Sequence, residues 1–216
     1  YIMKILTMKF GGTSVADIDR IKAVRDIISD EIRDGWNVVA VVSAMSKETN
    51  KLIDLAKQVG VENLVDPEYD SLISTGEDVS SSLLAIALNS IEISSRSWRG
   101  WQLPIRTDSF HSKAKIEEIN TNQIINSFKE GVKVAVVSGF QGIEESGRIT
   151  TLGRGGSDTS AVAIAAAIDA ERCDIYTDVS GIYTTDPRIK KNASKLKKIS
   201  FEEMLEMASL GANVLQ

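Results

Sequence analysis

The sequence has only one cysteine and one histidine, and each scarcity limits the chemistry that the chain can carry. A single cysteine, Cys173, excludes a disulfide framework and a metal site built from several cysteines. Its apolar context, CDIY, predicts a buried strand residue in a reducing compartment. The one histidine, His111, lies in DSFHSKAK, which is typical of a surface loop, so a mechanism built on a catalytic histidine has one weak candidate.

Long apolar runs and an excess of positive charge are also missing. The longest strictly apolar run, residues 161–168, is too short to cross a bilayer, and no charged leader precedes an apolar region. The net charge of −5 gives no basic field for nucleic acid, and the basic run over residues 188–198 is typical of a solvated surface connection. We therefore expect a soluble, cytoplasmic protein that binds neither nucleic acid nor membrane.

The apolar residues that are present predict alternating strands and helices. Residues 18–35 carry isoleucine and valine at helical spacing, and residues 72–88, 121–128 and 200–208 are further expected helices. Strands covered on both faces are predicted by runs rich in Val and Ile at residues 5–10, 38–43, 132–138 and 173–177. This alternation predicts an α/β fold with a mostly parallel sheet, in which residues 92–116 form an excursion with extra strands.

Small, polar or charged residues follow each of the four predicted strands. They occupy residues 9–14, 43–46, 138–140 and 177–178. In open α/β sheets, ligands bind beyond the carboxyl ends of the strands. Turn chemistry alone would account for any single one of these segments, because Gly and Ser are common where a chain reverses. Four such segments at the ends of four strands favour a functional rim.

The segment TLGRGGSDTSA, residues 151–161, has the composition of an anion-binding loop. Gly153, Gly155 and Gly156 let backbone N–H groups approach an anion closely, and a helix that starts near Ser157 would point its positive end the same way. The alternative is a tight turn in which Ser157 or Asp158 caps the helix. The glycines alone do not separate the two.

Two named phosphate motifs compete for this loop. The Walker pattern is absent, which excludes the ordinary P-loop enzymes. The dinucleotide fingerprint is closer, because Gly153 and Gly155 fill its first two positions and Asp178 follows about 20 residues later. However, Asp158 takes the third glycine position, and the preceding GRITT is short and polar where a long buried strand is needed.

A carboxylate inside a phosphate loop is better explained by phosphoryl transfer. Such a site needs cations on the moving phosphoryl group and an anion that orients them. Lys9 supplies a cation at the end of a strand, and the planar fork of Arg154 suits a carboxylate or phosphate. Glu77, in STGE at a helix start, is either a first-turn acid favourable to the helix dipole or a ligand for a substrate amine.

With these residues in place, the chain resembles the aspartokinases of the amino acid kinase family. The resemblance covers essentially the whole chain from Lys4, and it is carried by MKFGGTSV, VVSAMSKETNKL, STGE, VVSGFQG, TLGRGGSDTSA and DIYTDVSGIYTTDPR, in the family's order. It implies one catalytic domain over residues 1–216 with a three-layer α/β/α sandwich around a mainly parallel sheet. It also implies transfer of the γ-phosphoryl group of Mg-ATP to the β-carboxylate of L-aspartate, the first step of lysine, threonine, methionine and diaminopimelate synthesis.

The resemblance assigns roles residue by residue. Lys9 is the expected catalytic lysine, and Asp158 is the aspartate that organises it. Substrate contacts are expected from Arg154 on the α-carboxylate and Glu77 on the α-amino group, with Ser43 and Thr49 nearby. Nucleotide contacts are expected from Lys9, Gly11, Gly12, Gly155, Gly156, Thr177, Asp178, Tyr183 and Arg188, with ATP and Mg²⁺ as cofactors and no metal ligand predicted from the protein.

Two departures from the family's pattern affect the expected activity. Where many relatives have a lysine that helps to hold ATP, this sequence has Asn213. The sequence ends at Gln216, so the ACT-type regulatory domains that help relatives to form dimers are expected to be absent; a homodimer is expected only of the full-length protein. These departures keep open a nucleotide-binding module that is catalytically silent when isolated, with a dinucleotide-dependent oxidoreductase as a third possibility.

Overall fold

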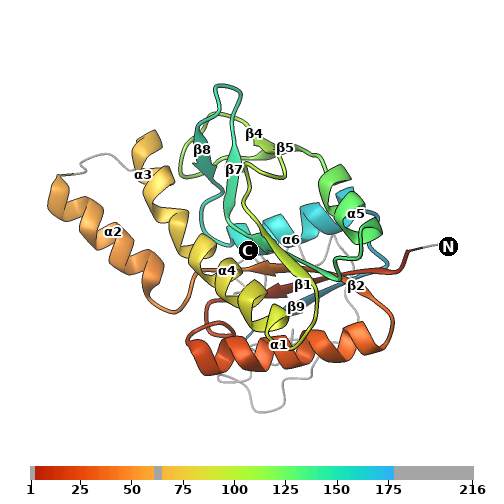
Figure 1. Cartoon of the computed structure of the whole chain (residues 1–216). Helices are drawn as coiled ribbons and strands as arrows, with labels where there is room; N and C mark the ends of the chain where they lie inside the picture. Colours follow the sequence, from red (N-terminus) through yellow and green to blue (C-terminus); the bar gives the residue numbers. More distant parts are fainter. Residues whose placement is uncertain (1–2, 61–64, 178–216) are drawn as a thin grey trace, which may run out of the picture. The chain divides into compact units, whose positions relative to one another are not determined.

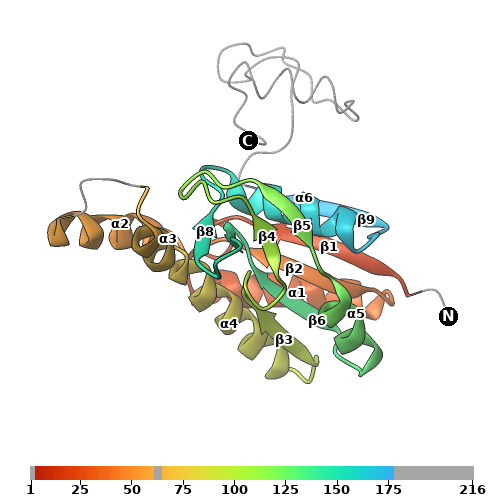
Figure 2. The same ribbon diagram turned by 90° about the horizontal axis from the view of Figure 1, so that it is seen from above.

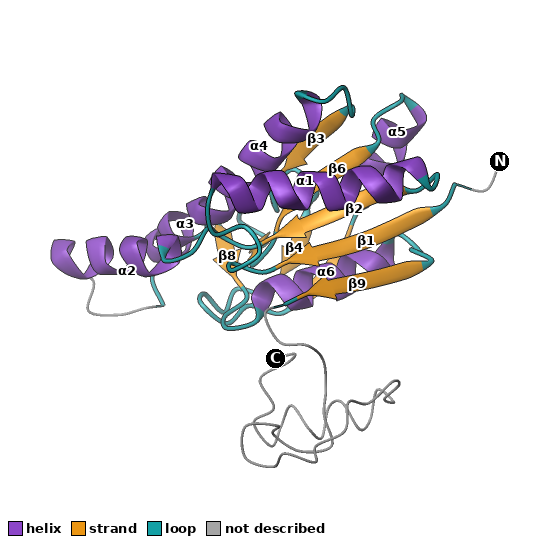
Figure 3. Cartoon of the chain, turned by 90° about the horizontal axis from the view of Figure 1, so that it is seen from below, coloured by secondary structure: helices purple, strands orange, loops and turns teal. Residues whose placement is uncertain are grey.

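A parallel β-sheet forms the centre of the fold. The structure is a computed structural model that describes residues 3–60 and 65–177; residues 1–176 form one compact unit and Thr177 belongs to a second. Within the described ranges the sheet has five strands in the order β3-β6-β2-β1-β9, all parallel (Figure 3). They are β1 (Ile5–Phe10), β2 (Asn37–Val42), β3 (Ser95–Trp98), β6 (Val134–Ser138) and β9 (Arg172–Tyr176). The four predicted strands are confirmed as β1, β2, β6 and β9.

Helices cover both faces of this sheet. On one face, α1 (Ile18–Arg33) and α4 (Thr75–Asn89) pack on Leu6, Met8 and other apolar strand residues. On the other face, α5 (Asn122–Lys129) and α6 (Gly156–Ala167) pack on the alternate residues, among them Val39 and Val41. Figures 2 and 3 show the sheet between these helices. This arrangement confirms the expected three-layer α/β/α sandwich, because strands covered on both faces are apolar at successive positions.

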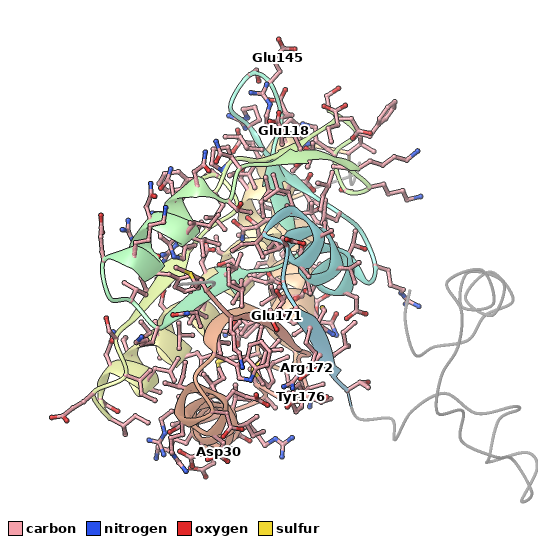
Figure 4. All side chains as sticks on the ribbon, turned by 90° about the vertical axis from the view of Figure 1, so that its right-hand side faces the viewer. Asp30, Glu118, Glu145, Glu171, Arg172 and Tyr176 are labelled. Atoms are coloured by element: carbon pink, nitrogen blue, oxygen red, sulfur yellow. The ribbon has the colours of Figure 1, made fainter. Side chains whose placement is uncertain are left out.

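A second, smaller sheet lies beside the first. Its order within the described residues is β5-β4-β7-β8. Its members are β4 (Ile105–Thr107), β5 (Ile116–Ile119), β7 (Gln141–Ile143) and β8 (Ile149–Thr151). Figure 4 shows Glu145 at the outer tip of the hairpin that joins β7 to β8. The extra strands expected over residues 92–116 are therefore present as β3 and β4, and β8 leads directly into the glycine loop.

The helix predicted over residues 72–88 is divided. It corresponds to the end of α3 (Pro67–Ile73) and most of α4, with a break at Ser74. At the break, the backbone carbonyl of Ser74 accepts a hydrogen bond from Nε2 of Gln141 at 3.1 Å, a tertiary contact between residues distant in sequence. The preceding helix, α2 (Glu48–Val59), was not predicted, and Figure 1 shows α2 and α3 extending away from the main sheet.

The prediction that Cys173 is buried is wrong. Cys173 lies in β9 as expected, but it is exposed. In the described part of the chain, β9 pairs only with β1 and forms an edge of the sheet. An apolar run predicts a strand, but it does not distinguish an edge strand from a central one.

Lys47 supplies a testable feature at the start of α2. It has a φ of 68°, in the left-handed region, and its side chain makes no capping hydrogen bond. A side chain in this region costs roughly 1–2 kcal/mol, which glycine avoids. We expect Lys47→Gly to raise the free energy of unfolding by about 1 kcal/mol in urea titrations. Lys51→Gly, inside α2, is the matched control and should lower it by about 1 kcal/mol; a decrease for both variants would contradict the strain at Lys47.

Candidate active site

The carboxyl ends of three adjacent strands bring the predicted rim residues to one edge of the sheet. Lys9 is paired in register with Val41, one residue before the end of β2, and Val42 is paired with Ser138 at the end of β6. Ser43 follows β2 directly, and its backbone N–H donates to the carbonyl of Phe10 at 3.0 Å. The polar segments after these strands therefore start from one common edge.

A buried ion pair joins the end of β1 to the first turn of α6. Nζ of Lys9 lies 2.6 Å from Oδ1 of Asp158, and the side chains are 10% and 14% exposed. The N-cap of α6 is Gly155, with a φ of 75° and no side-chain capping bond. The interpretation in which Asp158 or Ser157 serves as the cap is therefore wrong. Asp158 directs its carboxylate to a lysine, so the strand and the loop share one charged centre.

Three glycines near this ion pair permit close approaches that a side chain would block. A side chain at Gly11 would bring its Cβ within 3.3 Å of Nζ of Lys9, and one at Gly12 would lie 3.1 Å from the carbonyl of Ala44. At Gly156, the first residue of α6, a Cβ would lie 2.9 Å from atoms of Leu152 and Phe140. Gly11 thus leaves room beside the Lys9 ammonium, which suits a phosphate group, whereas Gly12 and Gly156 allow close packing against neighbouring segments.

Glu77 is a buried carboxyl beside the end of β2. It lies in the first turn of α4, is 4% exposed, and its Oε1 accepts from the backbone N–H of Ala44 at 3.1 Å. Among the described residues, no hydrogen-bond donor reaches Oε2. Burial raises the pKa of Glu77 to about 8, with a smaller contribution from the nearby Asp78 carboxylate. An acidic group in this environment favours a cationic partner such as an ammonium group.

Arg154 and Thr49 are placed differently from the ion pair. Arg154 is exposed in the glycine loop, and Thr49 is partly buried in the first turn of α2. Within the described ranges, no hydrogen bond or ion pair joins either side chain to Lys9, Asp158 or Glu77. The chain places Arg154 four residues before Asp158, so the loop that carries one also carries the other.

The nucleotide segment falls largely outside the described residues. Asp178, Tyr183, Arg188 and Asn213 lie there, as do the basic run 188–198 and the expected helix 200–208. Thr177, the last described residue, follows β9 directly. The roles expected for these residues stay predictions.

β9 is held at its start by α1 and at its end by β1. The rings of Phe10 and Tyr176 stack with centroids 4.7 Å apart, and Arg172 forms an ion pair with Glu31 of α1 at 2.8 Å. In Figure 4, Arg172 and Tyr176 lie near α1, the helix that carries Asp30. These contacts fix the strand from which the nucleotide segment departs.

One polar centre was missed by sequence reasoning. Asp70 of α3 is fully buried and accepts hydrogen bonds from residues 111, 112 and 151, which lie on other elements. His111 lies in a loop, as predicted, but its side chain is only 11% exposed, and its Nδ1 lies 3.0 Å from Oδ2 of Asp70. No local pattern reveals a partner 41 residues away, so the sequence carried no signal for this pair.

No three His, Cys, Asp or Glu side chains in the described ranges gather closely enough to hold a metal ion. No helix in the same ranges is long and apolar enough to cross a membrane.

Comparisons with known proteins agree with this geometry. The sequence pattern of the amino acid kinase family matches residues 4–216. An aspartate kinase of Stutzerimonas stutzeri is 54% identical over 215 residues, which are 99% of this chain and 52% of the relative. The chain thus spans about half the length of the curated relatives it matches.

Solved structures show the same similarity. The aspartate kinase of Synechocystis superposes with a TM-score of 0.83 at 47% identity, over 98% of this chain and 35% of that one. Aspartokinase III of E. coli, in complex with aspartate and ADP, superposes with a TM-score of 0.85 at 30% identity, over 99% of this chain and 58% of that one. The dinucleotide fingerprint has no counterpart here, because the strand before the glycine loop is the three-residue β8 of the second sheet. Fold, site and family pattern together place the chain in the amino acid kinase family.

Proposed function

We propose that the chain is the catalytic domain of an aspartate kinase. It transfers the γ-phosphoryl group of ATP to the β-carboxylate of L-aspartate and forms 4-phospho-L-aspartate, the first step of lysine, threonine, methionine and diaminopimelate synthesis. The observation that carries the proposal is the buried Lys9–Asp158 ion pair at 2.6 Å, beside Gly11, whose lack of a side chain leaves room for phosphate next to the ammonium. The names of the similar proteins supply the acceptor, L-aspartate.

The proposed reaction needs charge placement and no proton transfer. An oxygen of the β-carboxylate forms a bond to the γ-phosphorus, and the bond from that phosphorus to the β–γ bridging oxygen breaks, so ADP leaves with the electron pair. Negative charge moves across the transferring group, and the ammonium of Lys9 is placed to stabilise it. Asp158 holds that ammonium in position and prevents its side chain from adopting other rotamers.

Substrate recognition in this proposal uses the remaining rim. Glu77 takes the α-amino group through Oε2, and Arg154 takes the α-carboxylate, with Ser43 and Thr49 nearby. Backbone N–H groups at Gly11, Gly12, Gly155 and Gly156 hold phosphate oxygens, and Thr177, Asp178, Tyr183 and Arg188 hold the rest of the nucleotide. Mg²⁺ enters with ATP, bound by phosphate oxygens and water, and neutralises phosphate charge.

A second candidate is a nucleotide-binding module that is silent when isolated. Asn213, at the position where many relatives have a lysine that helps to hold ATP, favours it. Because both candidates bind ATP, turnover alone separates them.

The test combines calorimetry with an assay for ADP release. We expect ATP to bind and ADP to form only when L-aspartate is added, with L-glutamate as the control acceptor. ATP binding without aspartate-dependent ADP identifies the silent module. Binding of NAD without binding of ATP contradicts both candidates.

A further inference from the structure

Asp70 accepts hydrogen bonds from two separate segments of the chain, the loop at residues 111–112 and the strand residue Thr151. It lies on α3 and is fully buried. Its Oδ2 accepts from Nδ1 of His111 at 3.0 Å and from the backbone N–H groups of Ser112 and Thr151, both at 2.9 Å. Its Oδ1 accepts from the hydroxyl groups of Ser112 at 3.1 Å and Thr151 at 2.8 Å. Both carboxylate oxygens are therefore occupied, so the anion is well solvated by the protein.

The two hydrogen bonds from Thr151 to Asp70 fix the strand that leads into the glycine loop. Thr151 is the last residue of β8 and stands two residues before Gly153. Its carbonyl accepts from the N–H of Ala114 at 2.9 Å, while its own N–H and hydroxyl group donate to Asp70. The start of the loop is thereby held from two sides.

The bonds to Ser112 hold a strained backbone against the same loop. Ser112 has a φ of 64°, a region that non-glycine residues adopt only when their surroundings impose it. The carbonyl of Ser112 lies 3.1 Å from where a Cβ on Gly153 would stand, so the two backbones are in close contact. Gly153 itself has a φ of 78°. Asp70 therefore supports the loop both directly, through Thr151, and indirectly, through Ser112.

We propose that Asp70 is a positioning residue that sets the geometry of the glycine loop, and through it the placement of Arg154 and Asp158. This inference rests on the proposed function, since its kinetic consequence is expressed in the handling of aspartate. Asp70 touches neither Lys9 nor Asp158 in the described contacts, so it acts through the loop and not on the substrate.

The test is Asp70→Asn, with Glu68→Gln as the matched control. The amide keeps the size of the side chain but turns an NH₂ group toward N–H and O–H donors, so the network loses acceptors. Glu68 lies on the same helix, with a side chain that is 74% exposed and paired with Arg148, and its variant removes the same charge from the surface.

Two readouts separate positioning from general stability. Because KM does not depend on the fraction of folded enzyme, we expect Asp70→Asn to raise the KM for aspartate about tenfold and to lower kcat up to about a hundredfold. Amide hydrogen exchange of peptides covering residues 110–115 and 150–158 should accelerate about tenfold, with β1 unchanged. Glu68→Gln should leave both readouts at parent values. An unchanged KM, or exchange that rises equally in β1, would overturn the proposal.

The experiment remains decisive if Asp70→Asn does not fold or if the parent chain is inactive. If Asp70→Asn does not fold, Thr151→Val removes one hydroxyl bond to Asp70 and keeps the backbone bond, and about threefold faster exchange in the loop is then expected. If the parent chain shows no aspartate-dependent activity, the proposed function fails, and loop exchange alone decides whether Asp70 positions the loop.

Discussion

Replacing Lys9 by methionine is expected to lower kcat about a hundred- to a thousandfold, because the variant removes the cation nearest to the proposed phosphoryl path. Loss of one such electrostatic donor typically costs about 10²–10³ in rate, and the ammonium also fixes Asp158 at 2.6 Å. Initial rates of aspartate-dependent ADP release measure the effect. Lys22→Met on α1, whose side chain is 55% exposed, is the matched control and should keep the parent rate.

The same substitution leaves a buried carboxylate without its partner. Removing one member of a buried pair costs about 3–5 kcal/mol, so Lys9→Met should also unfold at lower urea concentration. The double variant Lys9→Met with Asp158→Asn removes both charges and should recover much of this stability without recovering turnover. A double variant with near-parent kcat would show that the pair is structural and that the catalytic cation lies elsewhere.

Glu77→Gln is expected to change stability and aspartate affinity in opposite directions. The folded-state pKa of Glu77 is raised to about 8, whereas the unfolded chain has the ordinary value of 4.5. Between these values the unfolded state ionises while the folded state keeps its proton, so the parent loses stability as pH rises from about 4.5 to about 8. Glutamine keeps an acceptor for the N–H of Ala44 and has no charge to lose. The variant should therefore unfold at higher urea concentration than the parent at pH 8, and at a similar concentration at pH 4.5.

Aspartate binding should weaken in the same variant. A carboxylate that accepts from an ammonium group contributes about 1.5–3 kcal/mol, so KM for aspartate should rise roughly 10- to 100-fold. Asp34→Asn, an exposed change at the C-cap of α1, controls for the loss of one acidic group. If Glu77→Gln gains stability at pH 8 but binds aspartate like the parent, Glu77 is a buried structural acid and the amine is recognised elsewhere.

The layers of the fold were predictable because four strands of the main sheet are apolar runs that can be recognised from the sequence alone. Val38 to Val42 are apolar at every position, as strands covered on both faces must be, and the isoleucines of α1 recur at helical spacing. Cys173 was misplaced because the same signal does not report which strand lies at the edge. The short strands β7 and β8 were missed because three residues are too few for a period to appear.

The site was predictable where chemistry is local in sequence. The glycine loop, Lys9 and Glu77 each stand in a short polar segment after a buried strand or at a helix start, and the resemblance joined Lys9 to Asp158 before the structure brought them together. Asp70 was not predictable, because YDSL is an ordinary helical segment and its partners lie about 40 and 80 residues later. Networks of this kind depend on tertiary folding, which no single segment encodes.

The most direct test of the central proposal is to trap the acyl phosphate with hydroxylamine. The purified chain is incubated with Mg-ATP and L-aspartate, with L-glutamate as the control, and aspartyl hydroxamate is measured. We expect hydroxamate that depends on aspartate and is lost in Lys9→Met but kept in Lys22→Met. Absence of hydroxamate with the parent chain while ATP still binds would contradict carboxylate phosphorylation by this chain, and equal hydroxamate from Lys9→Met would contradict the role of Lys9.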